Sequence, residues 1–252
     1  MDNSKTFIIG DTHLQFRQIK PLLSPLITRH KPQHLIFVGD YTDQWGQLHN
    51  NELYLKELDL LLEFKRDMET QGVRVTYLLG NHDVAYITGH LMAYSNTSLK
   101  IQSQIRTKLR LMDCRLSIKS NGYVISHAGF AGNSKVRGVD KLPSVKTLAG
   151  LSDPARFSLH ASCLWLRPDE LLSNPSQCYP KQIFGHTPTE TIQIDPARPY
   201  INVDTFSLTR DYQPIGDGSI LMLNDGKAEK LTTGWLDLSH QLECFTDLNS
   251  FS

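Results

Sequence analysis

The chain has 252 residues, of which 40% are hydrophobic and 21% are charged, and such a chain can bury a substantial core. Its 26 Lys and Arg residues are balanced by 26 Asp and Glu residues, so no overall charge attracts it to nucleic acid or to an acidic membrane. The sequence holds no stretch of 18 apolar residues that could span a bilayer.

Two further features bear on where the protein works. The N-terminal residues lead directly into a predicted strand and include no secretory hydrophobic region. The four cysteines have neither paired spacing nor the spacing of a disulfide framework. We therefore expect reduced thiols in a cytoplasmic protein.

The first half of the chain alternates predicted strands with predicted helices. Strands are expected at Thr6–Ile9, Leu35–Val38 and Val73–Leu79. Helices are expected around Ile19–Ile27, over Asn51–Thr70 and over Leu99–Met112, where apolar residues recur at helical spacing. Pro21 and Pro25 are expected to distort the first helix or to split it. This alternation favours a mainly parallel or mixed sheet covered by helices.

The second half is richer in short strands. A hairpin is expected from Arg115–Ile118 and Tyr123–Ser126, joined at Asn121-Gly122, and is followed by irregular sequence over about 130–158. A helix is expected at Ala161–Leu172, and strands are expected near Gln182–Phe184, Tyr200–Val203, Ser219–Leu223 and Ala228–Thr232. With no repeat and no linker, the sequence predicts one domain over residues 1–252. Its expected class is α/β, a four-layer α/β/β/α sandwich of two mixed sheets flanked by helices.

Five short clusters of acidic, histidine and amide residues recur along the chain. They are Gly10-Asp11-Thr12-His13, Gly39-Asp40-Tyr41-Thr42-Asp43, Gly80-Asn81-His82-Asp83, Ser126-His127-Ala128-Gly129 and Gly185-His186-Thr187-Pro188. Each follows an apolar run that reads as a strand, and ligands of α/β sheets bind beyond the carboxyl ends of strands. Any one cluster alone is explained by turn chemistry. The ordered set of five instead indicates a metal site.

The donor types in these clusters suit two divalent ions. Asp, His and Asn offer the oxygen and nitrogen donors that Mn, Fe, Zn, Ni or Co accept, and the lack of Cys argues against a structural zinc. Asp11 and His13 point to the same side of an extended strand end. Asp40 could bridge two ions. Paired metals clamp both oxygens of a phosphoryl displacement and lower the pKa of a bridging water.

The ordered set resembles the calcineurin-like metallophosphoesterases. More narrowly, it is similar to the phosphoprotein phosphatase branch, which includes small phage and bacterial protein phosphatases and the symmetrical diadenosine tetraphosphate hydrolases. The matching motifs run from Asp11 to His186. The later segment Asn202-Val203-Asp204-Thr205 is similar to a strand of that branch, and we expect Asp204 to bond a loop near the metals.

The resemblance implies a role for each residue of the site. A first metal would be held by Asp11, His13 and the bridging Asp40. A second metal would be held by Asp40, Asn81, His127 and His186. Catalysis would use His82 as the general acid and Asp43 as the carboxylate that orients it and raises its pKa. A metal-bound hydroxide would attack phosphorus in line.

Three residues depart from the pattern of the branch, and a fourth departs from the pattern of other members of the superfamily, which favours the branch. Leu14 stands where glycine is usual, Gln44 stands where a phosphate-binding Arg is usual, and Asp83 replaces a Glu. Pro188 occupies the position of a further ligand histidine in other members of the superfamily. Because Gln cannot supply the charge of the missing Arg, the substrate is the least constrained part of the prediction.

Two other residues have two interpretations each. Leu164-Trp165-Leu166-Arg167 resembles a Trp-x-Arg segment that presents a second phosphate-binding Arg, so Arg167 either binds substrate or caps carbonyls at a helix end. Trp45 either stacks on an aromatic ring of the substrate or packs under its loop.

The sequence thus predicts a metal-dependent phosphoesterase that hydrolyses phosphomonoesters, either a phosphoprotein or a small phosphorylated substrate. Manganese is the expected metal. The alternative activity is a nucleotide pyrophosphohydrolase or phosphodiesterase of the diadenosine polyphosphate type, and a second rival is a non-catalytic binding module that keeps the fold. The expected partner is the phosphorylated substrate, with neither a membrane nor a nucleic acid indicated.

Overall fold

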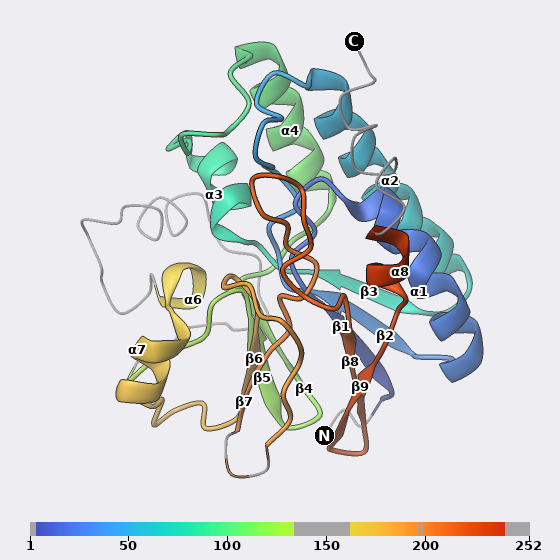
Figure 1. Ribbon diagram of the computed structural model, residues 1–252, viewed down its shortest axis with the longest axis vertical. Coiled ribbons are helices and arrows are strands. Elements are labelled where there is room, and N and C mark those ends of the chain that lie inside the picture. The colour runs from blue at the N-terminus through green and yellow to red at the C-terminus, as the bar shows by residue number, and fades with distance from the viewer. Residues whose placement is uncertain (1–3, 134–161, 196, 198, 240–252) are drawn as a thin grey trace.

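The computed structural model describes residues 4–133, 162–195, 197 and 199–239. In this part of the chain two mixed sheets pack face to face, and helices lie on the outer side of each sheet (Figure 1). The predicted α/β sandwich with its two helix-covered sheets is confirmed. Most of the segment expected to be irregular, over about 130–158, lies outside the described residues. None of the described helices has the length and apolarity that a membrane span needs.

The first sheet carries the N-terminal strands. Its strand order is β3 (Arg74–Tyr77), β2 (His34–Phe37), β1 (Thr6–Ile9), β8 (Ile220–Asn224) and β9 (Lys227–Leu231). Strands β1, β2 and β3 run parallel, while β8 and β9 add antiparallel pairs at the other edge. The carboxyl ends of the three parallel strands therefore meet at one edge of the sheet.

The second sheet is shorter. Its order is β4 (Ser117–Ser120), β5 (Tyr123–Ser126), β6 (Gln182–Phe184) and β7 (Tyr200–Asn202). The predicted hairpin turn is present. Asn121 has φ 49° and Gly122 has φ 83°, because both central residues of such a tight turn must adopt left-handed backbone. Strand β4 begins at Ser117, two residues later than predicted, and Arg115 forms only an isolated bridge to Leu78.

Successive side chains of a strand point to opposite faces of its sheet, and this divides the core into layers. Ile8 and Ile36 of the first sheet share an apolar cluster with Ile125 and Ile183 of the second sheet. Their sequence neighbours, such as Phe37, lie in the cluster beneath the helices. This burial on both faces fixes the register of each strand, because a slip by one residue would exchange the two faces.

Three long helices cover the first sheet. They are α1 (Phe16–His30), α2 (Asn51–Thr70) and α4 (Leu99–Leu111). Phe16 of α1 lies edge-on to Phe37, with ring centroids 5.6 Å apart, and to Phe64 of α2, at 5.1 Å. The side chain of Asn50 caps α2 by accepting a hydrogen bond from the backbone N–H of Leu53, at 3.2 Å.

Helix α1 is not split by its two prolines. Pro21 and Pro25 are both exposed and lie four residues apart, so they share the outer face of the helix. Water can therefore bind the carbonyl groups that lose their helical partners there.

The shorter helices differ more from the predictions. The helix expected at Ala161–Leu172 is two helices, α6 (Ser162–Trp165) and α7 (Pro168–Ser173), because Pro168 cannot continue the first helix and begins the second. Helix α3 (Asn81–Thr88) was not predicted. Neither was α8 (Trp235–Ser239), whose buried Trp235 packs edge-on against Phe206 at 5.3 Å.

A buried carboxylate joins α1 to α2. Glu57 of α2 is 2% exposed and accepts a hydrogen bond from the backbone N–H of Arg17 in the first turn of α1, at 3.1 Å. No side chain of its own N-cap residue caps helix α1, so the carboxyl group of Glu57 acts as the cap. Burial raises the pKa of Glu57 to about 8, against the opposing effect of Arg17.

Stability should therefore fall with rising pH between the unfolded-state pKa, about 4.5, and the folded-state pKa, about 8. In that window the folded protein holds a proton that the unfolded chain has released, at up to about 1.4 kcal/mol per pH unit. Urea denaturation from pH 5 to pH 9 should show this fall in the wild type and a shallower one in Glu57→Gln. If the free energy of unfolding fell equally with pH in the two proteins, Glu57 would have the same pKa in the folded and the unfolded chain.

Candidate metal centre

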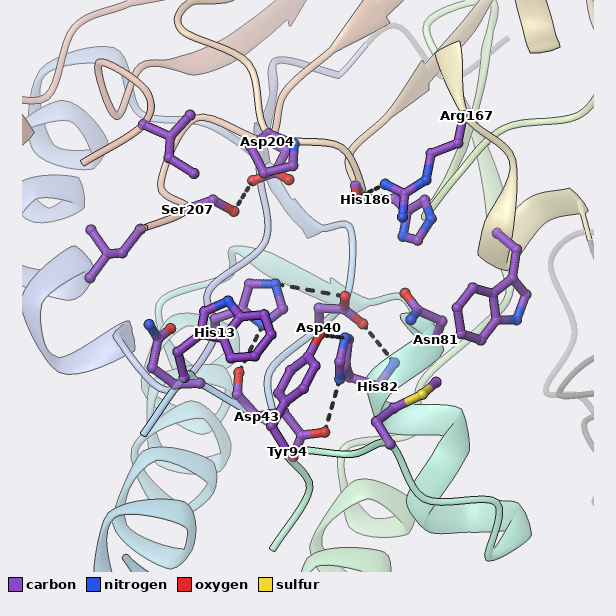
Figure 2. Close-up of a pocket in the computed structure, with 17 residues that line it drawn as sticks. His13, Asp40, Asp43, Asn81, His82, Tyr94, Arg167, His186, Asp204 and Ser207 are labelled. Atoms are coloured by element: carbon purple, nitrogen blue, oxygen red, sulfur yellow. Dashed lines mark hydrogen bonds and ion pairs between the residues drawn. The ribbon is translucent and has the colours of Figure 1, made fainter. Parts of the chain in front are cut away.

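The predicted ligands come from the carboxyl ends of both sheets and meet in one place. Asp11 and His13 follow β1, Asp40 follows β2, and Asn81 begins α3 just after β3. His127 and His186 follow β5 and β6 of the second sheet. Four of them line a single pocket together with His82, Asp43 and Arg167 (Figure 2).

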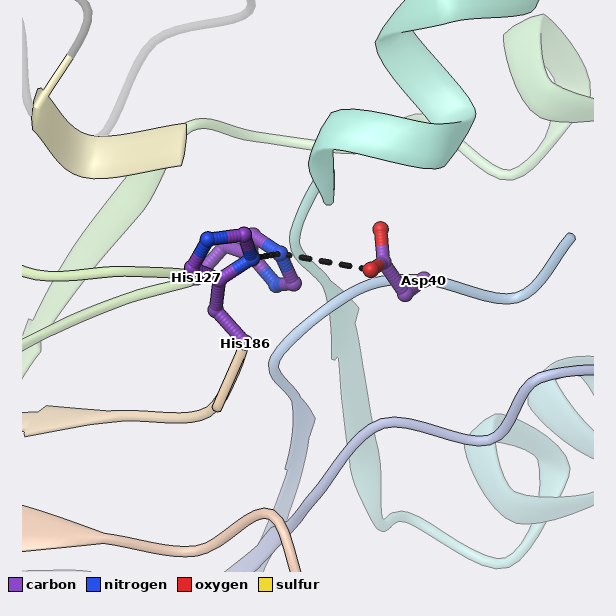
Figure 3. A group of neighbouring side chains, drawn as sticks. All are labelled: Asp40, His127 and His186. Atoms are coloured by element: carbon purple, nitrogen blue, oxygen red, sulfur yellow. Dashed lines mark hydrogen bonds and ion pairs between the residues drawn. The ribbon is translucent and has the colours of Figure 1, made fainter. Parts of the chain in front are cut away.

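The donor atoms form two groups that share one carboxylate. In the first group, donor atoms of Asp40, His127 and His186 all lie within 4.8 Å of one another (Figure 3). In the second group, those of Asp11, His13 and Asp40 meet the same limit. The amide oxygen of Asn81 lies 2.9 Å from His127 Nε2 and so extends the first group. The structure thus brings together all six residues that the sequence nominated as ligands.

Hydrogen bonds fix which nitrogen each histidine offers. His127 Nδ1 lies 3.1 Å from the carbonyl oxygen of Val38, and His13 Nδ1 lies 2.9 Å from that of Asp43. Because a carbonyl can only accept, each Nδ1 carries a hydrogen, and each Nε2 faces the donor atoms of its group. His127 Nε2 lies 3.2 Å from His186 Nδ1, as two nitrogens aimed at a common cation would.

Burial keeps the two histidines of the first group neutral. Burial lowers the pKa of His127 to about 4, although Asp40 raises it. Burial, with His127 and Arg167 nearby, also lowers the pKa of His186. Both rings are therefore deprotonated and able to bind a metal at neutral pH.

The carboxylates of the site crowd one another in the absence of a cation. Burial, Asp204 and Asp40 raise the pKa of Asp11 well above its usual value. Burial also acts to raise the pKa of Asp40, but the neighbouring histidines, His127 foremost, lower it to about 2. Among the described residues, Asp11 Oδ1 and His186 Nε2 are buried without a hydrogen-bond partner. This donor set fits divalent metal ions, which would supply the missing positive charge.

A histidine–carboxylate pair lies beside the ligands. His82 Nδ1 is 2.8 Å from Asp43 Oδ2. Asp43 is fully buried and also accepts hydrogen bonds from Tyr54, Tyr86 and Ser95, at 3.0, 2.6 and 2.7 Å. Four donors hold this carboxylate, so its orientation is fixed.

The carboxylates around His82 favour its charged form. Burial lowers the pKa of His82, but Asp40, Asp43 and Asp83 outweigh that effect and raise it to about 9. The ring therefore carries both protons at neutral pH in the protein without metal.

Asp83, one of the four departures, has a structural role that the sequence did not suggest. Its buried carboxylate accepts hydrogen bonds from the backbone N–H groups of Asp40, Gly80 and Tyr41, at 2.8, 3.0 and 3.0 Å. It thereby holds Asp40 at φ 51°, a left-handed conformation that costs a non-glycine residue about 1–3 kcal/mol.

Glycines let the ligand-bearing segments approach closely. A Cβ on Gly185 would lie 2.2 Å from Asp11 Oδ1, and a Cβ on Gly80 would lie 1.9 Å from Asp40 Oδ1. Leu14, another departure, adopts φ 58° where the branch usually has glycine, and its side chain is buried in the core. The glycines before Asn81 and His186 are thus a steric requirement.

Arg167 and Trp45 are placed at the wall of the pocket. Arg167 is exposed, and its Nη1 donates to the carbonyl oxygen of His186 at 3.2 Å (Figure 2). The same nitrogen donates to Thr187 Oγ1 at 3.0 Å. It therefore bonds the loop of a metal ligand instead of the end of a helix. Trp45 stacks on Tyr94, with ring centroids 4.3 Å apart.

The remaining sequence candidates also lie at this pocket. Gln44 is buried and accepts a hydrogen bond from Gln15 at 3.3 Å, while its own Nε2 has no partner among the described residues. Asp204 accepts a hydrogen bond from Ser207 at 2.7 Å, as expected of a residue that bonds a nearby loop.

Sequence reasoning missed Tyr94 and Ser95. They lie in the segment between α3 and α4, where no spacing in the sequence relates them to His82 or Asp43.

Comparison with known proteins shows which family of proteins the chain resembles. The family model of the calcineurin-like phosphoesterases matches residues 4–221, most of the sequence. A protein serine/threonine phosphatase from Saccharomyces cerevisiae is 14% identical, covers 92% of this chain and 80% of its own, and has a TM-score of 0.59. A cold-active protein-tyrosine phosphatase from a psychrophilic Shewanella is 17% identical, covers 91% and 80%, and has a TM-score of 0.53. At these identities the two structures support the fold alone. The curated proteins contain no significant match.

Metal removal should destabilise the protein, since Asp11, Asp40 and Asp204 would then face one another without a cation. Thermal melting with EDTA and with added Mn²⁺ should show a higher Tm in Mn²⁺. The expected gain is about 2.7 kcal/mol at a free metal concentration one hundred times Kd. Asp40→Asn should lose this shift, and Asp225→Asn, in an exposed turn, should keep it. An equal shift in Asp40→Asn would show that the metal binds elsewhere.

Gly185→Ala should weaken metal binding by about tenfold or more, because its Cβ would displace Asp11. It should also cost about 1–3 kcal/mol of stability through overpacking. Manganese titration calorimetry and urea denaturation measure the two effects. The control is Gly89→Ala, whose Cβ would meet nothing within 4 Å but whose φ is 83°, so it tests backbone strain alone. Unchanged manganese affinity in Gly185→Ala would contradict the steric argument.

Proposed function

The chain belongs to the calcineurin-like phosphoesterase family, a family of hydrolases that act on phosphoester bonds, and on this basis we propose that it is a phosphomonoesterase. The substrate would be a phosphoprotein or a small phosphorylated molecule. One observation carries the proposal: Asp40 belongs to both donor groups, and His82 lies against the same pocket with Asp43 behind it. A shared carboxylate beside a protonated histidine is suited to phosphoryl transfer.

Two divalent ions, manganese in the first instance, would be held by the six ligands. Asp11, His13 and Asp40 would hold one ion, and Asp40, Asn81, His127 and His186 would hold the other. When bound, such ions neutralise phosphoryl charge and lower the pKa of water.

The other residues would act on the phosphate and on the leaving group. Water attacks phosphorus in line with the leaving oxygen, a new P–O bond forms, and the P–O bond to the leaving group breaks. His82 Nε2 gives its proton to the leaving oxygen, while Asp43 holds the imidazole through Nδ1. The exposed guanidinium of Arg167, on the wall of the pocket, would bind a phosphate oxygen.

A second activity is supported by Gln44. Its neutral amide stands where a phosphate-binding Arg would favour monoesters, so a nucleotide pyrophosphohydrolase or phosphodiesterase is the alternative. Trp45 adds little support to it, because one face of its indole is stacked on Tyr94 and Arg210 lies over the ring, 4.2 Å from the centroid. Parallel assays on p-nitrophenyl phosphate, bis-p-nitrophenyl phosphate and a dinucleoside polyphosphate with Mn²⁺ separate the activities. The cytoplasmic location and the single domain over 1–252 stay predictions.

His82→Asn should lower kcat for phosphomonoesters by about a hundredfold or more, the usual contribution of a general acid. Metal content should be unchanged, because His82 belongs to neither donor group. Steady-state kinetics with Mn²⁺ and elemental analysis of the purified variant give the two measurements. Full turnover in this variant would remove His82 from the mechanism.

A further inference from the structure

Outside the proposed ligands, the His82–Asp43 pair and Arg167, the described residues that line the pocket form two groups. One group is buried and contains the polar side chains of Gln44, Asp204 and Ser207. The other group keeps part of its surface exposed, and every member is apolar or aromatic: Trp45, Met92, Tyr94, Trp165, Pro188 and Ile215. We call this second group the apolar wall. A bound molecule that reaches beyond the metal ligands would therefore meet apolar surface.

The apolar wall reaches the residue that is proposed to act on the leaving group. The ring of Tyr94 lies against the ring of His82, with centroids 4.9 Å apart (Figure 2). A leaving group whose oxygen lies at His82 would therefore lie against the wall. We propose that the site selects phosphomonoesters with an apolar leaving group, which the apolar wall removes from water. The proposal rests on the proposed phosphomonoesterase function.

The wall offers no positive charge to a leaving group. Among the described residues that line the pocket, Arg167 is the only Lys or Arg, and it is the residue proposed to hold the phosphate itself. Arg210 lies over the ring of Trp45 and is not one of the lining residues. A leaving group with further phosphates would lose water at the wall without gaining a cation, which argues against the diadenosine polyphosphate alternative.

Contacts behind the wall hold it in place. The ring of Tyr94 stacks on Trp45 with an interplanar angle of 26°. The carbonyl oxygen of Trp45 accepts a hydrogen bond from the hydroxyl of Tyr212 at 2.8 Å, and the guanidinium of Arg210 covers the indole. The segment that follows β7 therefore braces Trp45, and Trp45 braces Tyr94. A wall that is already ordered binds an apolar group at little entropic cost.

The size of the cavity limits the leaving group. Its volume is about 290 Å³, close to the lower end of the range of about 300–1,000 Å³ that is usual for ligand pockets. This volume suits a phosphate that carries a short alkyl chain or one aromatic ring. Each methylene that the wall removes from water should tighten binding by about two- to fourfold.

The first test measures binding and does not need turnover. Methyl-, butyl- and benzylphosphonate have a P–C bond in place of the scissile bond, so they bind without being hydrolysed. Titration calorimetry with Mn²⁺ present should show that butylphosphonate binds about tenfold or more tightly than methylphosphonate. Comparison of the butyl and benzyl compounds shows whether an aliphatic or an aromatic group is preferred. The compound 4-phosphonobutyrate, which ends in a carboxylate, should bind more weakly than butylphosphonate.

Variants of the wall test where the chain binds. Ile215→Ser and Met92→Ser, on two different segments, should each reduce the gain from methyl- to butylphosphonate by about threefold or more. Ile215→Leu keeps an apolar side chain of the same size and should keep the gain. The matched control is Ile194→Ser, because Ile194 is 39% exposed and is not among the described residues that line the pocket. This control should leave the gain unchanged.

The second test measures turnover of methyl phosphate and butyl phosphate with Mn²⁺. Their leaving alcohols have similar basicity, so a difference in kcat/KM reports the alkyl chain and not the need for a proton. The value of kcat/KM should be about tenfold or more higher for butyl phosphate. Ile215→Ser should remove most of this difference.

The outcomes separate the two proposals. Absence of turnover on both alkyl phosphates would overturn the proposed function, and the phosphonate series would still test the wall. Equal affinity for methyl- and butylphosphonate, or no binding of either, would overturn the role of the wall. Tighter binding of 4-phosphonobutyrate than of butylphosphonate, or an equal loss in Ile194→Ser, would overturn it as well.

Discussion

The buried carboxylate of Asp40 is the group on which the rest of the site depends. Its Oδ2 lies 3.4 Å from His127 Nε2 and 3.8 Å from His13 Nε2, so it touches both donor groups. Its Oδ1 accepts a hydrogen bond from the backbone N–H of His82 at 3.0 Å. A buried charge is costly unless it is paired, and the histidines that lower the pKa of Asp40 come from both sheets. The two halves of the sandwich therefore meet at one carboxylate.

Holding Asp40 in place requires backbone conformations that are unfavourable in isolation. His13, Asp40, Asp43 and His186 all have positive φ, between 39° and 67°. Strain of this kind persists only where surrounding contacts fix the chain. Here the contacts are the carboxylate of Asp83 and the apolar cluster between the sheets, which sets where each strand ends. The packing energy of the core thus stabilises a strained site at its edge.

Around His82 the structure forms successive layers of support. Asp43 contacts the ring, Tyr54 and Tyr86 contact Asp43, and the segment between α3 and α4 contributes Tyr94 and Ser95. Tyr54 belongs to α2 and Tyr86 to α3, so two helices help to orient the His82–Asp43 pair. The support of His82 is therefore a property of the whole N-terminal half of the fold.

The sequence by itself nominated the candidate ligand set and determined the two-sheet architecture and most of the long elements. It could do so because apolar runs and the donor-rich turns after them are local signals, as at Ile8-Ile9 before Asp11 or Val38 before Asp40. The tertiary structure alone decided that α1 runs unbroken through its prolines and that a helix begins at Asn81. It alone placed Tyr94 on His82 and Asp83 beneath Asp40. Each of these depends on which groups lie next to water or to a partner many residues away, and a chain read one segment at a time does not contain that information.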